Sequence, residues 1–97
     1  MGNENFGAPY IERFQRFQEA MKKQYPYIKL VGSTGLFSSG EIFDSVNNKL
    51  RDMKAEFVDE HNYSNAQWFL QNAGRYDTYS RTSVTKVFVG ELSLIHI

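Results

Sequence analysis

The sequence contains no cysteine, two prolines and one tryptophan among its 97 residues. Without cysteine the chain forms no disulfide bond and offers no thiolate to a metal ion. It also has no apolar run close to the roughly 18 to 20 residues that cross a bilayer. These absences exclude a disulfide scaffold and a thiolate metal site, and they leave the cellular location undetermined.

An excess of charge of either sign is missing as well. Lysine plus arginine and aspartate plus glutamate number 11 each, so the formal net charge is zero. No overall field therefore attracts nucleic acid or an anionic membrane surface, and we expect neither as a partner. A chain of this length forms at most one small domain, which buries about two thirds of its unfolded surface.

The first periodic segment predicts a helix that begins at Ala8 and ends before Pro26. Proline at position 9 suits a first helical turn, because its missing N–H costs nothing there. The residue before Pro26 is pushed out of the helical region, which ends the segment. The apolar residues that we expect to face the core recur at helical spacing and are Tyr10, Phe14, Phe17 and Met21.

The rest of the chain alternates between strand and helix patterns. Strands are predicted at residues 28–31, 57–58 and 86–89, and helices at residues 41–54 and 66–76. Asn65 or Ser64 would cap the last helix. This alternation indicates parallel strands joined by right-handed crossovers.

In sheets of this kind, functional sites lie at the carboxyl ends of the strands. Ser33, His61 with Tyr63, and Glu91 follow the three predicted strands, so we expect them at that edge. Residues 32–35 (GSTG) could suggest a phosphate-binding loop, but no lysine follows in the P-loop position.

The cluster Asp59-Glu60-His61 invites a metal interpretation. Consecutive side chains in an extended segment point to opposite faces, and a lone histidine makes a poor transition-metal site. We therefore expect no metal. The alternation instead places Asp59, His61 and Tyr63 on one side and Glu60 and Asn62 on the other.

Two glutamates stand out by their surroundings. Glu4 lies between short polar residues and glycines, a composition that favours a loop, and Glu91 follows Gly90 where a strand would stop. Cleavage of a glycosidic bond requires at least two carboxyl groups. One group protonates the leaving oxygen, and the other attacks or stabilises the anomeric carbon.

Ordered blocks of sequence surround these glutamates. They are residues 2–7 (GNENFG), 25–31 (YPYIKLV), 58–63 (VDEHNY), 68–73 (WFLQNA) with 75–77 (RYD), and 86–91 (KVFVGE). Together they resemble the α-L-arabinofuranosidases of glycoside hydrolase family 51. The resemblance covers residues 1–91, and it implies an α/β fold that is a fragment of a (β/α)8 TIM barrel, from the end of strand four to the end of strand seven.

The resemblance also implies an unusual domain organisation. Residues 1–91 would be a partial catalytic barrel, taken from a longer parent protein. Residues 92–97 (LSLIHI) look like an in-frame translation of the transposon end sequence used in sequencing libraries. We therefore expect them to be a tail that is not native.

The family assigns roles to the matching residues. Glu4 would be the acid/base and Glu91 the nucleophile of a retaining enzyme, whose carboxyl groups lie about 5 to 5.5 Å apart. Asn3 matches the residue that binds the sugar 2-hydroxyl, His61 shapes the sugar pocket, and Tyr63 supports the nucleophile. The implied partner is an arabinofuranosyl-containing saccharide, no cofactor is implied, and a homo-oligomeric parent stays open.

Two alternatives remain. The parent could be another retaining barrel glycosidase, such as an endo-β-glycanase. The chain could instead be a non-catalytic open α/β binding module with residues 32–35 as its ligand loop, which predicts cooperative thermal unfolding of residues 1–91. A barrel fragment would lack that transition, because it exposes unpaired strand edges, and it would be inactive alone.

Overall fold

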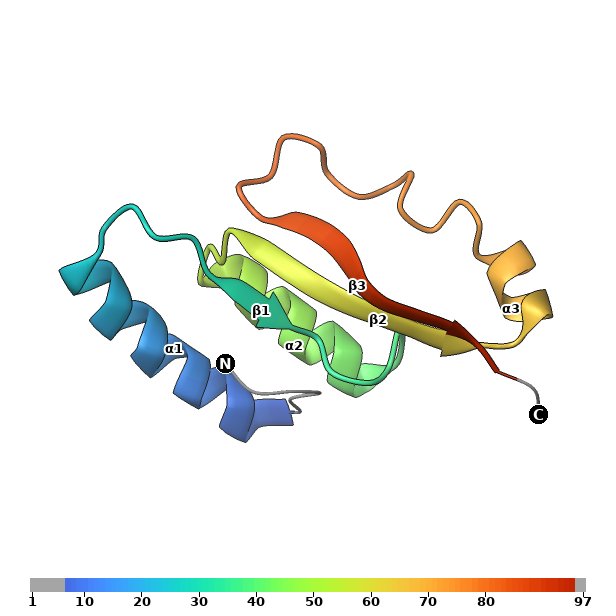
Figure 1. The fold of residues 1–97 in the computed structure, drawn as a ribbon, viewed down its shortest axis with the longest axis horizontal. Helices are drawn as coiled ribbons and strands as arrows, with labels where there is room; N and C mark the ends of the chain where they lie inside the picture. Colours follow the sequence, from blue (N-terminus) through green and yellow to red (C-terminus); the bar gives the residue numbers. More distant parts are fainter. Residues whose placement is uncertain (1–6, 96–97) are drawn as a thin grey trace.

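Helices and strands alternate along residues 7–95, the part of the chain that the computed structural model describes. In order they are α1 (Gly7–Gln24), β1 (Val31–Ser33), α2 (Glu41–Asp52), β2 (Phe57–Ser64), α3 (Ala66–Gln71) and β3 (Lys86–Leu94). The strands form one sheet in the order β1-β2-β3, and both neighbouring pairs are parallel (Figure 1). The predicted alternation of helices with parallel strands is confirmed.

The sheet is open, and this corrects the predicted fold class. Within residues 7–95 it has three strands, with β1 and β3 at its edges, whereas a (β/α)8 barrel closes eight. The prediction of a TIM-barrel fragment is wrong; the structure is a small three-stranded parallel sheet with three helices. The physical reason is that a strand–helix repeat is a local pattern, while closure depends on strand number and stagger.

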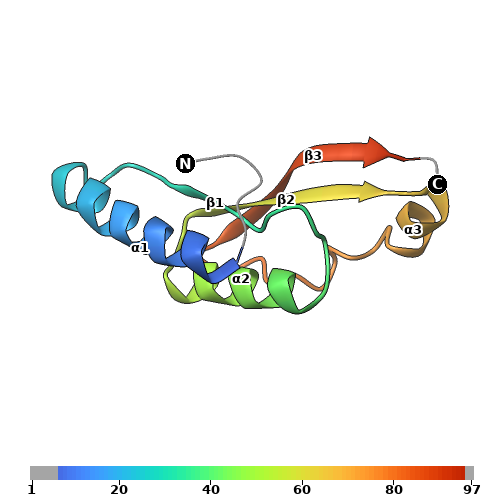
Figure 2. The same ribbon diagram turned by 90° about the horizontal axis from the view of Figure 1, so that it is seen from below.

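The core lies between the sheet and two helices on the same side of it, α1 and α2 (Figure 2). Leu50 of α2 is fully buried there, and Gly32 of β1 lets it approach closely. A Cβ added to Gly32 would lie 2.5 Å from Leu50 Cδ2, so a larger residue at this position would displace the Leu50 side chain from its place in the core. The core cluster consists of Tyr10, Ile11, Phe14, Leu30, Val46, Leu50, Ala55 and Val58.

Helix α1 buries a face slightly rotated from the predicted one. Phe14 is 1% exposed, but Phe17 is 52% exposed and Ile11 is buried in its place. At 3.6 residues per turn, Ile11 and Gln18 lie on one flank of the Tyr10–Phe14 direction and Phe17 on the other. The Ile11 flank faces the core, and Gln18 there donates a hydrogen bond of 2.9 Å to the Met53 carbonyl.

Strand β1 begins three residues later than predicted, at Val31. Just before it, the Leu30 N–H donates to Glu56 Oε2 at 2.9 Å instead of to a neighbouring strand, while the other oxygen of Glu56 binds Lys22. Partial burial raises the pKa of Glu56, but the hydrogen bonds from Lys22 and Leu30 outweigh it, and the net shift is downward.

Strands β2 and β3 extend well beyond the predicted residues 57–58 and 86–89. Asp59 to Tyr63 and Glu91 therefore lie inside strands rather than after them. Leu92 to Leu94 continue β3 beside Asn62 to Ser64, and the suggested origin of residues 92–97 stays a prediction. Among the described helices, none is long and apolar enough to cross a membrane.

Candidate functional site

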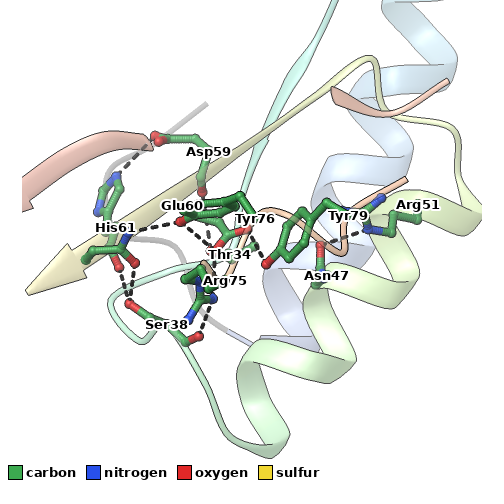
Figure 3. Close-up of polar contacts among 11 residues, drawn as sticks. Thr34, Ser38, Asn47, Arg51, Asp59, Glu60, His61, Arg75, Tyr76 and Tyr79 are labelled. Atoms are coloured by element: carbon green, nitrogen blue, oxygen red, sulfur yellow. Dashed lines mark hydrogen bonds and ion pairs between the residues drawn. The ribbon is translucent and has the colours of Figure 1, made fainter. Parts of the chain in front are cut away.

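Side chains along β2 alternate between the two faces of the sheet, as predicted. On one face His61 Nε2 lies 3.1 Å from Asp59 Oδ2, and the His61 and Tyr63 rings meet edge to face with centroids 6.0 Å apart. Glu60 instead accepts a hydrogen bond from the Tyr76 hydroxyl (Figure 3). Asn62 donates a hydrogen bond to the same hydroxyl. The predicted division of these residues between two faces is confirmed.

Glu91 reaches the His61 face because β3 contains a bulge. The register runs regularly to Val89 opposite Glu60, then continues with Glu91 opposite His61, so Gly90 is an extra residue. Residues paired across neighbouring strands point to the same side of a sheet. Without the extra residue, Glu91 would pair with Asn62 and point to the opposite face, since side-chain direction alternates with period two. The bulge therefore places a carboxylate beside His61.

The resulting pair differs sharply in exposure. The His61 side chain is 4% exposed and that of Glu91 is 46% exposed, and Glu91 Oε2 lies 3.8 Å from His61 Nδ1. This distance is too long for a hydrogen bond, and the buried Nδ1 has no hydrogen-bond partner among residues 7–95. The carboxylate is thus held near a buried ring nitrogen while it stays open to solvent.

Asp59 connects these groups through both of its oxygens. Oδ2 contacts His61 Nε2, and Oδ1 accepts the N–H of Gly90 at 2.8 Å. A Cβ on Gly90 would lie 2.2 Å from Asp59 Oδ1, so the bulge needs glycine for this contact. One carboxylate therefore binds both the ring that faces Glu91 and the backbone directly before Glu91.

A second carboxylate, Glu60, is fully buried on the opposite face of β2, and sequence reasoning gave it no role. Glu60 Oε1 accepts from Arg75 Nη2 at 2.9 Å and from the Tyr76 hydroxyl at 3.3 Å, and Oε2 accepts from the Tyr79 hydroxyl at 2.9 Å (Figure 3). Burial and the hydrogen bond to Glu60 raise the pKa of Tyr79 to about 12. The full set of donors explains how a carboxylate is accommodated without contact with solvent.

This network ties the connection after β1 to β2. Arg75 Nη2 donates to the Ser38 carbonyl at 2.7 Å, and the Ser38 hydroxyl lies 2.7 Å from both the His61 carbonyl and Asn62 Oδ1. The backbone at His61 is therefore fixed from the Glu60 side. The detectable signal in the sequence was the block 75–77 with Tyr79, where an arginine and two tyrosines follow a strand that contains a carboxylate.

The loop at residues 32–35 has no free backbone donors at its centre. Ser33 N–H donates to the Tyr10 hydroxyl at 2.8 Å, Thr34 N–H to the Asp59 carbonyl at 3.1 Å, and Gly35 N–H to Ser33 Oγ at 3.1 Å. A phosphate-binding loop needs such groups pointing at a ligand. Within residues 7–95, no group of three or more side chains of the metal-binding types could hold a metal ion.

Comparison with known proteins identifies the relatives of this chain. A family model described as the alpha-L-arabinofuranosidase 1 domain matches residues 1–81. The chain belongs to this family. The extracellular exo-alpha-L-arabinofuranosidase of Streptomyces chartreusis is 41% identical over 92 residues, which make up 94% of this chain. The chain spans 11% of the length of that arabinofuranosidase. No solved structure matches the chain.

The arabinofuranosidase resemblance is thus confirmed at the level of the domain family, and the structure describes part of the predicted site. It brings His61, Tyr63 and Glu91 to one face of β2 and β3. Asn3 and Glu4 lie outside the described residues, so their distance from Glu91 stays a prediction. Asp59, which the sequence placed on the correct face without a role, contacts His61 and the backbone N–H of Gly90, the residue before Glu91.

Proposed function

We propose that the protein containing this chain is a glycoside hydrolase of family 51, which removes terminal α-L-arabinofuranosyl residues from arabinose-containing polysaccharides or oligosaccharides. Membership in the alpha-L-arabinofuranosidase 1 domain family and the 41% identity to an exo-acting enzyme support this proposal. The structural observation that carries it is the bulge at Gly90, which turns the Glu91 carboxylate toward His61 and leaves it accessible.

The proposed mechanism uses two carboxyl groups. Glu4 donates a proton to the leaving oxygen while Glu91 attacks the anomeric carbon and forms a glycosyl-enzyme bond. Glu4 then removes a proton from water, which displaces Glu91, so that two inversions retain the anomeric configuration. Asn3 would bind the sugar 2-hydroxyl, and Tyr63 would support Glu91 from the same face of β2.

The two alternatives lack an observation of comparable weight. An endo-β-glycanase would share the glutamates, but the relative in Streptomyces is named as an exo-acting enzyme. A binding module built around residues 32–35 would need free backbone donors, and those N–H groups are engaged inside the chain.

The test is release of arabinose from an aryl α-L-arabinofuranoside by the protein expressed from the complete reading frame. We expect activity in the wild type, its loss in Glu91→Gln, and a decrease of about 10²- to 10⁴-fold in Glu4→Gln, the usual contribution of a general acid. Glu12→Gln is the matched control, because the Glu12 side chain is 72% exposed on α1. An active Glu91→Gln enzyme would contradict the assignment of the nucleophile.

Two further measurements separate parts of the proposal. Proton NMR of the sugar released first should show the α-anomer, and β-arabinose as first product would exclude the retaining mechanism. We expect the 97-residue chain alone to release no arabinose, because it spans only 11% of the length of the exo-acting relative. Release by the chain, abolished by Glu91→Gln, would show that these residues suffice.

A further inference from the structure

We propose that Asp59 is the positioning residue of this site, holding the tautomer and orientation of His61 with one carboxylate oxygen and the bulge that aims Glu91 with the other. This inference rests on the proposed function for its catalytic consequence. Its structural part stands on the contacts of Asp59 alone.

The first contact determines which ring nitrogen of His61 carries the proton. Asp59 Oδ2 lies 3.1 Å from Nε2, and a carboxylate only accepts hydrogen bonds, so Nε2 is the donor. In the neutral ring Nδ1 is then an unprotonated acceptor. Nδ1 is buried, has no hydrogen-bond partner in the part of the chain that the structure describes, and faces Glu91 Oε2 at 3.8 Å.

This tautomer has a consequence for the nucleophile. An Nδ1–H group would donate to Glu91 Oε2, draw negative charge from that carboxylate and weaken it as a nucleophile. With the proton held on Nε2 by Asp59, the ring supports Glu91 sterically and leaves its oxygens free. Asp59 thus acts on the nucleophile through a residue that it touches directly.

The second contact fixes the backbone that carries Glu91. The extra residue Gly90 is not paired with a residue of β2, and its N–H donates a hydrogen bond to Asp59 Oδ1 at 2.8 Å. A bulge beside an active site re-aims a side chain. Here the re-aimed side chain is Glu91, and the acceptor that holds the bulge is the same carboxylate that orients His61.

The two contacts can be separated by substitution. In Asp59→Asn, the amide oxygen can still accept the Gly90 N–H, but the NH₂ group now faces His61 Nε2 and donates to it. The ring proton moves to Nδ1 and binds Glu91. Asp59→Ala removes both contacts, and Asp44→Asn is a matched control because Asp44 is an exposed residue of α2.

The kinetic test uses the protein expressed from the complete reading frame and an aryl α-L-arabinofuranoside. We expect kcat to fall about 10-fold in Asp59→Asn and about 10²-fold in Asp59→Ala, the scale of a misplaced reacting group, with KM changed less than threefold. Asp44→Asn should match the wild type. Values of kcat within twofold of the wild type in both Asp59 variants would overturn the proposal, as would a loss that appears only in KM.

The tautomer is read by ¹⁵N NMR of His61 in the protein expressed from the complete reading frame. We expect a protonated Nε2 in the wild type and a protonated Nδ1 in Asp59→Asn, a change that a merely structural role would not produce. An unchanged tautomer in Asp59→Asn would overturn the positioning role. Absence of arabinose release by the wild type would instead refute the proposed function, and the NMR result would still decide the role of Asp59.

Discussion

Replacing Gly90 with alanine tests whether one side-chain contact shapes the bulge that aims Glu91. Gly90 is not among the glycines with positive φ, so alanine meets no backbone strain at this position. The obstacle is Asp59, because the new Cβ would lie 2.2 Å from Oδ1 and 2.7 Å from Cγ. The Asp59 side chain must rotate away and give up its hydrogen bonds.

The expected cost follows from the contacts that are lost. A hydrogen bond to a charged group contributes about 1.5 to 3 kcal/mol, and a buried donor left unpaired costs about 1 to 3 kcal/mol. The hydrogen bond from the Gly90 N–H to the Asp59 carboxylate is of the first kind. His61 Nε2–H becomes an unpaired buried donor, which is the second kind of cost. Because the Asp59 side chain is 21% exposed, water compensates in part, and we expect a loss near the lower end, about 3 kcal/mol.

The assay is urea unfolding of the protein expressed from the complete reading frame, arranged as a double-mutant cycle between Gly90→Ala and Asp59→Ala. Once Asp59 is alanine the obstacle is gone, so Gly90→Ala should then cost less than about 1 kcal/mol, a coupling of about 2 kcal/mol. Gly74→Ala is the control, because the atom nearest to its added Cβ is an Asp77 carboxylate oxygen at 3.1 Å, compared with 2.2 Å at Gly90. An equal cost of Gly90→Ala in both backgrounds would refute the reasoning.

Two further predictions concern the buried carboxylate Glu60. The pKa of Tyr79 is raised to about 12, above the unfolded value of about 10, so its contribution to stability is complete below about pH 10 and is lost between about pH 10 and 12. Ultraviolet titration should show a last phenolate step that Tyr79→Phe removes, and persistence of that step would contradict the assignment. Arg75→Met leaves the fully buried Glu60 without its cation and should lower the free energy of unfolding by about 3 kcal/mol, whereas Arg16→Met breaks an exposed pair and should cost less than about 1 kcal/mol in the same urea assay. Equal losses of unfolding free energy for the two arginine variants would show that the buried pair contributes no more to stability than the exposed pair.

Helix positions and side-chain alternation were predictable because they depend on local periodicity. Asn65 caps α3 as predicted, accepting the Trp68 N–H at 2.9 Å, and the alternation along β2 put Asp59 on the correct face. Helix α3 nevertheless ends at Gln71 rather than near Tyr76, and none of its residues is buried. With no apolar face in the core, the later turns lack the packing that sustains a helix in a protein.

The face of the sheet on which Glu91 lies could not be predicted from the sequence around it. Read as a regular strand, β3 would point Glu91 to the face of Glu60 and Asn62. The sequence contains Gly90 but does not reveal that it is an extra residue, since a bulge is defined only against a neighbouring strand. The acceptor that holds it, Asp59, lies 31 positions away in the chain.

By itself, the sequence determined the order of helices and strands, their parallel pairing, the division of β2 side chains between two faces and the similarity to arabinofuranosidases. These follow from spacing and residue type within short segments. The tertiary structure decided that the sheet is open, that Phe17 stays exposed, that Glu60 is buried among Arg75, Tyr76 and Tyr79, and that Glu91 faces His61. Each of these depends on contacts between residues far apart in the chain, whose register no local pattern specifies.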